Sequence, residues 1–169
     1  MITFKDFIHN TPDFPKKGVM FRDVSPLLEH HFTEMVQGMT SLFSEEEWAD
    51  VTTLAGIDSR GFIVASALAI HLNKGLTLIR KKGKLPPPVV GQDYQLEYGT
   101  DKLEMKPGKG KVMLVDDVLA TGGTMQAAAN LCQTAGYDVK GMATLIDLKF
   151  LNTFNWEGQT VRSLVQYNE

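Results

Sequence analysis

The 169-residue sequence has a single cysteine, Cys132, and no long run of apolar residues. One cysteine cannot form a disulfide within the chain, and the small apolar residues around it predict a packed thiol in a reducing, cytoplasmic setting. A membrane-spanning helix needs about 20 predominantly apolar residues, and a secretory signal needs a basic start followed by an apolar core. The sequence shows neither pattern, so we expect neither export nor contact with a membrane.

The sequence also lacks an excess of basic residues, internal repeats and low-complexity segments. Its net charge is -3 at pH 7, with 22% charged and 43% hydrophobic residues. Such a composition is typical of a globular protein and gives no electrostatic reason to expect nucleic acid as a partner. The length and the lack of a linker predict one domain over residues 1–169.

Two stretches of the chain have the order strand, helix, strand: residues 51–80 and residues 111–148. The expected strands are residues 51–57, 76–80, 111–117 and 139–148, and the expected helices are residues 62–72 and 124–135. Gly75 and Gly136 are expected to end the two helices. Two such βαβ units predict an α/β fold with a mostly parallel sheet flanked by helices.

The residues before the first unit are expected to be mainly helical. Residues 2–9 predict a short helix, residues 11–18 a proline-rich loop, and residues 25–43 an amphipathic helix. Ser44 and Glu47 have the spacing of a capping box and predict a further short helical turn.

A glycine-rich loop follows the first strand of the second unit, in the stretch VMLVDDVLATGGT. Its glycines let the backbone approach a ligand, Thr121 and Thr124 add hydroxyls, and a helix begins there, so the loop is suited to a phosphate. Taken alone, it is also an ordinary strand-to-helix turn. Asp116 and Asp117 precede it, and the chain has no GxxxxGK[ST] loop. The two acids are therefore better explained as ligands of sugar hydroxyls than as the magnesium site of a nucleotide hydrolase.

The first unit has a polar loop at the equivalent position, DSRG, over residues 58–61. Ligands of parallel α/β sheets bind beyond the carboxyl ends of the strands, so both loops are expected at one edge of the sheet.

The stretch VMLVDDVLATGGT resembles the 5-phosphoribosyl 1-diphosphate (PRPP) signature of the type I phosphoribosyltransferases. Other segments are similar, in the same order, to those of the adenine-using members: FPKKGVMFRDVSPLL, AGIDSRGF, LIRKKGKLP and YQLEYG. The resemblance covers nearly the whole chain. It implies the type I phosphoribosyltransferase fold, with a small hood at about residues 1–30 plus the C-terminal segment and a mobile lid at about residues 82–102.

The resemblance also implies a reaction: transfer of the phosphoribosyl group to N9 of adenine, giving AMP and pyrophosphate, for purine salvage. The residues expected at the 5′-phosphate are Ala120, Thr121, Gly122, Gly123 and Thr124, and those at the ribose are Asp116 and Asp117. The residues expected at pyrophosphate are Asp58, Ser59, Arg60, Gly61, Arg80, Lys81, Lys84 and Tyr98. The residues expected at adenine are Met20, Phe21, Arg22 and Leu148.

Two of the residues are expected to be catalytic, Arg60 at the leaving group and Glu97 at the purine ring. The resemblance further implies a non-proline cis peptide in DSRG and a Mg²⁺ ion held mainly by PRPP, pyrophosphate and water, with no direct protein ligand. It also implies a homodimer in which the segment RKKGK, residues 80–84, reaches toward pyrophosphate across the interface.

Two alternatives remain open. Members of the family that use 6-oxopurines, such as xanthine, hypoxanthine or guanine, typically carry an aspartate where this chain has Ala120, which argues against that substrate class. A non-catalytic module that senses PRPP or purines is the other alternative. Such regulators usually carry an added DNA-binding segment, which we do not find, and Glu97 also argues against this alternative.

Overall fold

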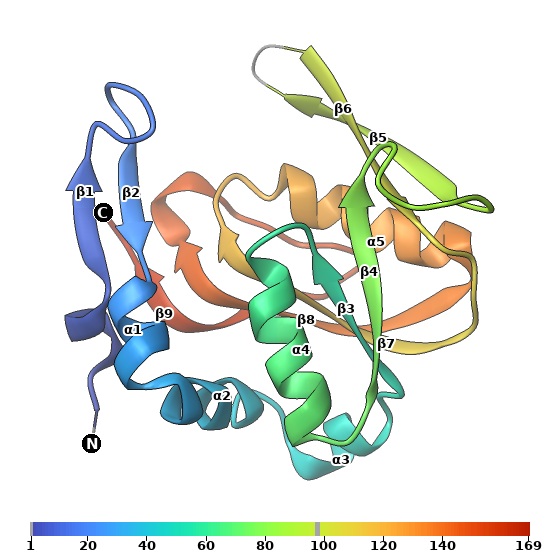
Figure 1. The fold of residues 1–169 in the computed structure, drawn as a ribbon, viewed down its shortest axis with the longest axis horizontal. Coiled ribbons are helices and arrows are strands. Elements are labelled where there is room, and N and C mark those ends of the chain that lie inside the picture. Colours follow the sequence, from blue (N-terminus) through green and yellow to red (C-terminus); the bar gives the residue numbers. More distant parts are fainter. Residues whose placement is uncertain (1, 97–98) are drawn as a thin grey trace.

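The computed structural model describes residues 2–96 and 99–169. Its centre is a seven-stranded sheet with the order β5-β6-β4-β3-β7-β8-β9 (Figure 1). The strands are β3 (Thr53–Ile57), β4 (Gly75–Lys81), β5 (Val90–Leu96), β6 (Gly99–Met105), β7 (Gly110–Leu119), β8 (Tyr137–Leu148) and β9 (Arg162–Tyr167). Neighbours from β4 to β9 are parallel, while β6 is antiparallel to both β4 and β5. The predicted α/β class with a mostly parallel sheet is confirmed.

Both predicted βαβ units are present, with α4 (Gly61–His71) between β3 and β4 and α5 (Gly123–Ala135) between β7 and β8. Gly136 follows α5 with a φ of 109° and ends that helix, as predicted. The prediction that Gly75 ends α4 was wrong. Asn73 takes the left-handed conformation there, with a φ of 53°, which asparagine tolerates better than most residues, and Gly75 begins β4.

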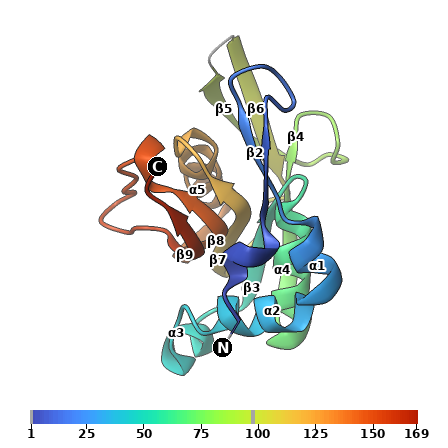
Figure 2. The same cartoon turned by 90° about the vertical axis from the view of Figure 1, so that its left-hand side faces the viewer.

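The two helical layers cover opposite faces of the sheet (Figure 2). On one face, α4 packs with α1 (Ser25–His30) and α2 (Phe32–Thr40) over a core that includes Leu27, Met39 and Leu54. On the other face, α5 packs over a second core that includes Leu114 and Cys132. Burial raises the pKa of the Cys132 thiol to about 12, as expected of a packed and unreactive cysteine.

The N-terminal region differs most from the prediction. Of the short helix predicted over residues 2–9, only Phe4–Phe7 is helical, as the 3₁₀ turn η1. The chain then forms an antiparallel pair of strands, β1 (His9–Pro12) and β2 (Met20–Asp23). The predicted helix over residues 25–43 is divided into α1 and α2 at His31, whose φ is -139°. The His31 ring packs edge-on against Phe7, 4.1 Å between centroids, a contact that no local pattern reveals.

The capping box is confirmed, because Ser44 and Glu47 exchange the two expected hydrogen bonds at the start of α3 (Glu45–Ala49). Among the described residues, no helix is both long enough and apolar enough to cross a membrane.

Two strand pairs stand at the carboxyl-terminal edge of the parallel strands (Figure 1). The pair β1-β2 lies on the side of β9, and the pair β5-β6 extends the sheet beyond β4. The edge of the sheet between them is where the two polar loops lie.

Candidate active site

The two polar loops are held side by side by the sheet. Strands β3 and β7 are parallel neighbours, with Gly56 opposite Val115, so both chains leave the sheet at the same edge. Gly61 then starts α4 directly against β7. A Cβ atom on Gly61 would lie 2.9 Å from the Asp116 carboxylate and 3.1 Å from the Val115 carbonyl, so this approach requires glycine.

The loop after β7, residues 120–124, is here called the phosphate turn. Gly122 has a φ of 95°, and α5 begins at the next residue with no acidic residue in its first turn. The N–H groups and the positive end of the helix dipole are therefore available to an anion. A small cavity of about 80 Å³ lies at this turn, and it is lined by Asp116, Val118, Leu119, Ala120, Thr121, Gly122, Gly123, Thr124 and Met125.

Asp116 and Asp117 lie inside β7, because the strand continues beside β8 to Leu119 instead of ending at the predicted residue 117. The Asp117 N–H donates to Asp116 Oδ1 at 2.8 Å. Burial raises the pKa of Asp116 well above its ordinary range, and the adjacent Asp117 carboxylate raises it further. Asp117 Oδ2 lies 2.7 Å from Arg60 Nε, so one guanidinium joins the two loops.

The loop after β3, residues 58–61, is here called the pyrophosphate turn. Its Asp58–Ser59 peptide bond is cis, as the resemblance implies. The nearly buried Asp58 carboxylate lies 3.3 Å from Arg80 Nε and 3.6 Å from Lys84 Nζ. These predicted basic residues therefore meet at one carboxylate of their own chain.

The segment that carries the basic residues is itself held in place. The Gly83 N–H donates to the Glu104 carboxylate of β6 at 2.6 Å, and Lys81 Nζ lies 3.3 Å from Asp101 Oδ2. Both acids belong to the strand pair β5-β6, which thereby contacts the basic segment.

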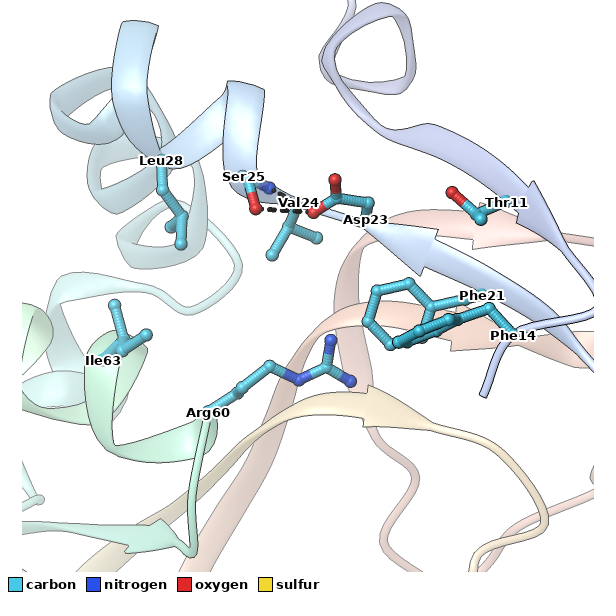
Figure 3. A pocket seen from close by; sticks show the side chains of 9 residues that line it. All are labelled: Thr11, Phe14, Phe21, Asp23, Val24, Ser25, Leu28, Arg60 and Ile63. Carbon is cyan, nitrogen blue, oxygen red and sulfur yellow. Dashed lines mark hydrogen bonds between the residues drawn. The ribbon is translucent and has the colours of Figure 1, made fainter. Parts of the chain in front are cut away.

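A larger pocket of about 520 Å³ opens between β2 and α4 (Figure 3). It is lined by Thr11, Phe14, Phe21, Asp23, Val24, Ser25, Leu28, Arg60 and Ile63. The Arg60 guanidinium points across the pocket toward the Phe21 ring, 4.9 Å from its centroid. Phe14 packs edge-on against Phe21, with 5.1 Å between centroids. Arg60 therefore contacts both the Asp117 carboxylate and the Phe21 ring.

Not all predicted adenine residues meet at this pocket. Met20, Arg22 and Leu148 do not line it. The Arg22 guanidinium lies over the Tyr167 ring of β9, 4.0 Å from its centroid, and Leu148 is partly buried against the core. Of the four residues predicted at adenine, only Phe21 lines this pocket.

Two further site residues, Glu97 and Tyr98, lie outside the described residues. Sequence analysis assigned no site role to Ser25, Leu28 or Ile63, which line the pocket in the structure. Among the described residues, no three His, Cys, Asp or Glu side chains gather in a way that could hold a metal ion.

Comparisons with known proteins show the family of the chain. A family model described as "Phosphoribosyl transferase domain" matches residues 28–149. The adenine phosphoribosyltransferase of Hydrogenovibrio crunogenus is 54% identical over 164 residues, which cover 96% of this chain and 95% of that protein. The chain belongs to the adenine phosphoribosyltransferase family. A second member, from Bdellovibrio bacteriovorus, is 50% identical over 96% of this chain and 98% of its own length.

Solved structures of this family share the fold. The adenine phosphoribosyltransferase of Rhodothermus marinus has a TM-score of 0.84 at 39% identity and covers 97% of this chain and 96% of its own. The Saccharomyces cerevisiae protein, solved with adenine and an imino-altritol bisphosphate, also has a TM-score of 0.84, at 30% identity over 95% of this chain and 96% of its own. Both turns fall within the matched family domain, whereas β1 and β2 precede it. The two relatives that align over 96% of the chain extend the sequence similarity beyond this family domain.

Proposed function

We propose that this protein transfers the 5-phosphoribosyl group of PRPP to N9 of adenine and so forms AMP and pyrophosphate in purine salvage. The observation that carries the proposal is the juxtaposition of two unlike turns at one sheet edge. The phosphate turn offers backbone donors and a helix N-terminus, and the pyrophosphate turn offers a guanidinium. Two carboxylates lie between them, which suits a ribose with an anionic group at each end.

PRPP binding begins from the ion pair between Arg60 and Asp117. We expect the 5′-phosphate to accept hydrogen bonds from the phosphate turn, while the ribose 2′- and 3′-hydroxyls donate to Asp116 and Asp117. The hydroxyls replace Arg60 as the partner of Asp117, and the freed guanidinium then donates to pyrophosphate. Ser59 and Gly61 add backbone donors, and Tyr98 contributes to the proposed pyrophosphate site. Arg80, Lys81 and Lys84 belong to the segment that we expect to reach pyrophosphate across the dimer interface.

In the reaction, N9 of adenine forms a bond to C1′ while the bond from C1′ to the pyrophosphate oxygen breaks, and the imidazole N–H proton of the purine ring is lost. Positive charge develops on the ribose, and the carboxylates of Asp116 and Asp117 stabilise it. Negative charge develops on pyrophosphate, and Arg60 stabilises it. Mg²⁺ enters as part of the PRPP substrate and adds positive charge at the leaving group. We expect PRPP, pyrophosphate and water to hold this ion, with no direct ligand from the protein.

We place adenine at the pocket beside Phe21, with its 6-amino group and N1 read by backbone atoms of Met20 and Arg22, and with Leu148 on the other side of the ring. This arrangement requires β2 and Leu148 to approach each other when substrate binds. Glu97 is proposed to accept a proton or hydrogen bond from the purine ring as charge moves through it. The hood, residues 1–30 with the C-terminal segment, and the lid, residues 82–102, are the parts proposed to close over the bases and the phosphates.

Formation of nucleotide and pyrophosphate from PRPP and Mg²⁺ tests the proposal, with adenine, hypoxanthine, guanine and xanthine supplied separately. AMP from adenine alone is the expected result. Product from an oxopurine would contradict the inference from Ala120, and no product with any base, despite PRPP binding, would favour a regulatory module. A Glu97→Gln variant tests the role of the ring partner, and unchanged turnover would remove that role.

We also propose a homodimer in the cytoplasm. Two exposed apolar residues, Phe32 on α2 and Ile70 on α4, offer a surface for a second copy. The packed thiol of Cys132 is compatible with a reducing compartment. Sedimentation equilibrium tests the dimer, since a monomer at micromolar concentration would contradict it.

A further inference from the structure

The loop that follows β8 contacts the phosphate turn through the side chain of Asn152. Asn152 is not among the residues that line the cavity of this turn. Its side-chain Nδ2 nevertheless lies 2.9 Å from the carbonyl oxygen of Ala120, the first residue of the turn. Asn152 therefore contacts the turn without lining its cavity.

The Asn152 amide makes hydrogen bonds to several residues of the surrounding chain. Besides Ala120, Asn152 Nδ2 lies 3.0 Å from the Leu148 carbonyl oxygen and 3.1 Å from Asp147 Oδ1. Asn152 Oδ1 accepts the Phe154 N–H at 3.2 Å. The amide is thus held from both of its ends, which leaves the side chain little freedom to rotate.

The partners of Asn152 are themselves anchored. Asp147 is 0% exposed, and its Oδ2 lies 2.7 Å from Lys149 Nζ, so the buried carboxylate has a counter-charge within the same loop. Further along the loop, the Trp156 indole N–H donates to Asn130 Oδ1 of α5 at 2.8 Å. The loop is therefore attached both to the end of β8 and to the helix that begins at the phosphate turn.

Holding a carbonyl also orients the N–H group of the next residue. In a trans peptide the C=O and N–H bonds point in opposite directions across the peptide plane. The cis bonds lie elsewhere, at Phe14–Pro15, Asp58–Ser59 and Pro87–Pro88. Because Asn152 holds the Ala120 carbonyl, the Thr121 N–H points away from Asn152, and Thr121 is among the residues that line the cavity.

We propose that Asn152 is a positioning residue for phosphate binding, which aims the Thr121 N–H at the 5′-phosphate by fixing the Ala120 carbonyl. The inference rests on the proposed function, since it takes the ligand of the turn to be a 5′-phosphate.

The test compares Asn152→Ala and Asn152→Asp with a matched control, Asn130→Ala. Asn152→Asp keeps the shape but replaces the amide donor with a carboxylate that faces three oxygen acceptors. Asn130→Ala removes a hydrogen bond from the same loop without touching Ala120. The affinities for AMP and for ribose 5-phosphate are measured by titration calorimetry. The KM for PRPP and the KM for adenine are measured separately by steady-state kinetics.

We expect both Asn152 variants to bind AMP and ribose 5-phosphate roughly threefold to tenfold more weakly, the range for one lost hydrogen bond. The KM for PRPP should rise in the same proportion, while the KM for adenine changes less than about twofold. Asn130→Ala is expected to lower the melting temperature and leave both affinities unchanged.

Unchanged affinity for AMP in Asn152→Ala would overturn the inference. An equal loss of affinity in Asn130→Ala would overturn it too, because it would indicate general loosening of the loop. If the wild-type protein makes no AMP but binds ribose 5-phosphate, the proposed function fails while the comparison of variants still decides the role of Asn152. A wild-type protein that binds neither phosphate ester overturns both.

Discussion

The phosphate turn and the pyrophosphate turn occupy equivalent positions in two βαβ units, yet they are built by different means. The phosphate turn has no charged side chain among residues 120–124 and depends on backbone geometry, with Gly122 in the left-handed region. The pyrophosphate turn contains Asp58 and Arg60, and both are engaged in ion pairs.

The difference corresponds to what each turn would hold during the reaction. A 5′-phosphate keeps its charge throughout, so a fixed set of N–H donors serves it in every state. Pyrophosphate gains charge as it leaves, and mobile cations can follow that change. Arg60, Arg80 and Lys84 each pair with a carboxylate in the structure, and we propose that pyrophosphate takes the place of that carboxylate when it binds.

The largest effect is expected from Gly122→Ala, which attacks the backbone geometry of the phosphate turn. An alanine would adopt a positive φ at a cost of about 1–2 kcal/mol, and its Cβ would lie 2.7 Å from the Phe154 ring. We expect kcat/KM for PRPP to fall about a hundredfold and the melting temperature to fall by about 5 °C.

Gly123→Ala is the matched control, because its Cβ would meet only Thr121 Oγ1 at 4.0 Å. Its melting temperature should equal that of the wild type. If Gly122→Ala binds AMP as tightly as the wild type, the phosphate turn does not depend on backbone geometry and the comparison fails.

The next largest effect is expected from Arg60→Ala, which removes the charge of the pyrophosphate turn. Losing charge-assisted hydrogen bonds of roughly 1.5–3 kcal/mol should lower kcat/KM by about tenfold to a hundredfold. Thr121→Ala in the phosphate turn keeps its N–H and should cost only about threefold. Steady-state kinetics with both variants checks the contrast, and equal losses would show that the two turns bind by the same means.

Asp116→Asn is expected to have a smaller effect. It should raise the stability of the protein without ligand and lower its affinity for PRPP. Burial raises the pKa of Asp116 above its usual 3.8, so the folded protein binds this proton more tightly than the unfolded chain. The stability from the protonated form is present below that usual value and is lost as the pH rises through the raised folded value. At pH 7, folding of the wild type therefore carries a free-energy cost at Asp116 that Asp116→Asn avoids.

We expect Asp116→Asn without ligand to melt about 3 °C higher than the wild type at pH 7, and PRPP affinity to fall roughly tenfold. The difference in melting temperature should disappear below about pH 4, where both side chains are neutral. Calorimetric melting over this pH range checks the sign, and a destabilised variant at pH 7 would contradict it.

The smallest effect is expected from salt. Raising NaCl from about 0.05 M to about 0.5 M should weaken pyrophosphate binding severalfold, because the cations around Arg60 are partly exposed, and should affect ribose 5-phosphate less. Asp58→Asn releases Arg80 and Lys84 from their shared carboxylate and should steepen the salt dependence for pyrophosphate alone. Titrations with both anions at several salt concentrations measure the two slopes, and equal slopes would remove the distinction between the turns.

Sequence analysis predicted the βαβ units and the two turns because their signals are local. Apolar runs, Gly136 and the glycine-rich stretch each act within a few residues of where they stand. The division of the helix at His31 depends on Phe7, which is distant in sequence, so helical spacing alone could not predict it.

The same limit applies within the site. The DSRG motif predicted where Arg60 lies, but not that its guanidinium pairs with Asp117 and covers Phe21, since these contacts join three separate segments. Asn152 had no signal at all, because a single asparagine in an irregular loop matches no motif.

The sequence has two tryptophans, and the fold separates them. Trp48 lies in α3, at the end of the molecule away from the carboxyl-terminal edge of the sheet (Figure 1). Trp156 is buried in the loop that supports the phosphate turn, two residues from the Phe154 that packs against Gly122. Trp156 is therefore placed to report ligand binding at the phosphate turn through its fluorescence. A change in fluorescence on adding ribose 5-phosphate that persists in Trp48→Phe and vanishes in Trp156→Phe would allow phosphate binding to be followed in real time without a label.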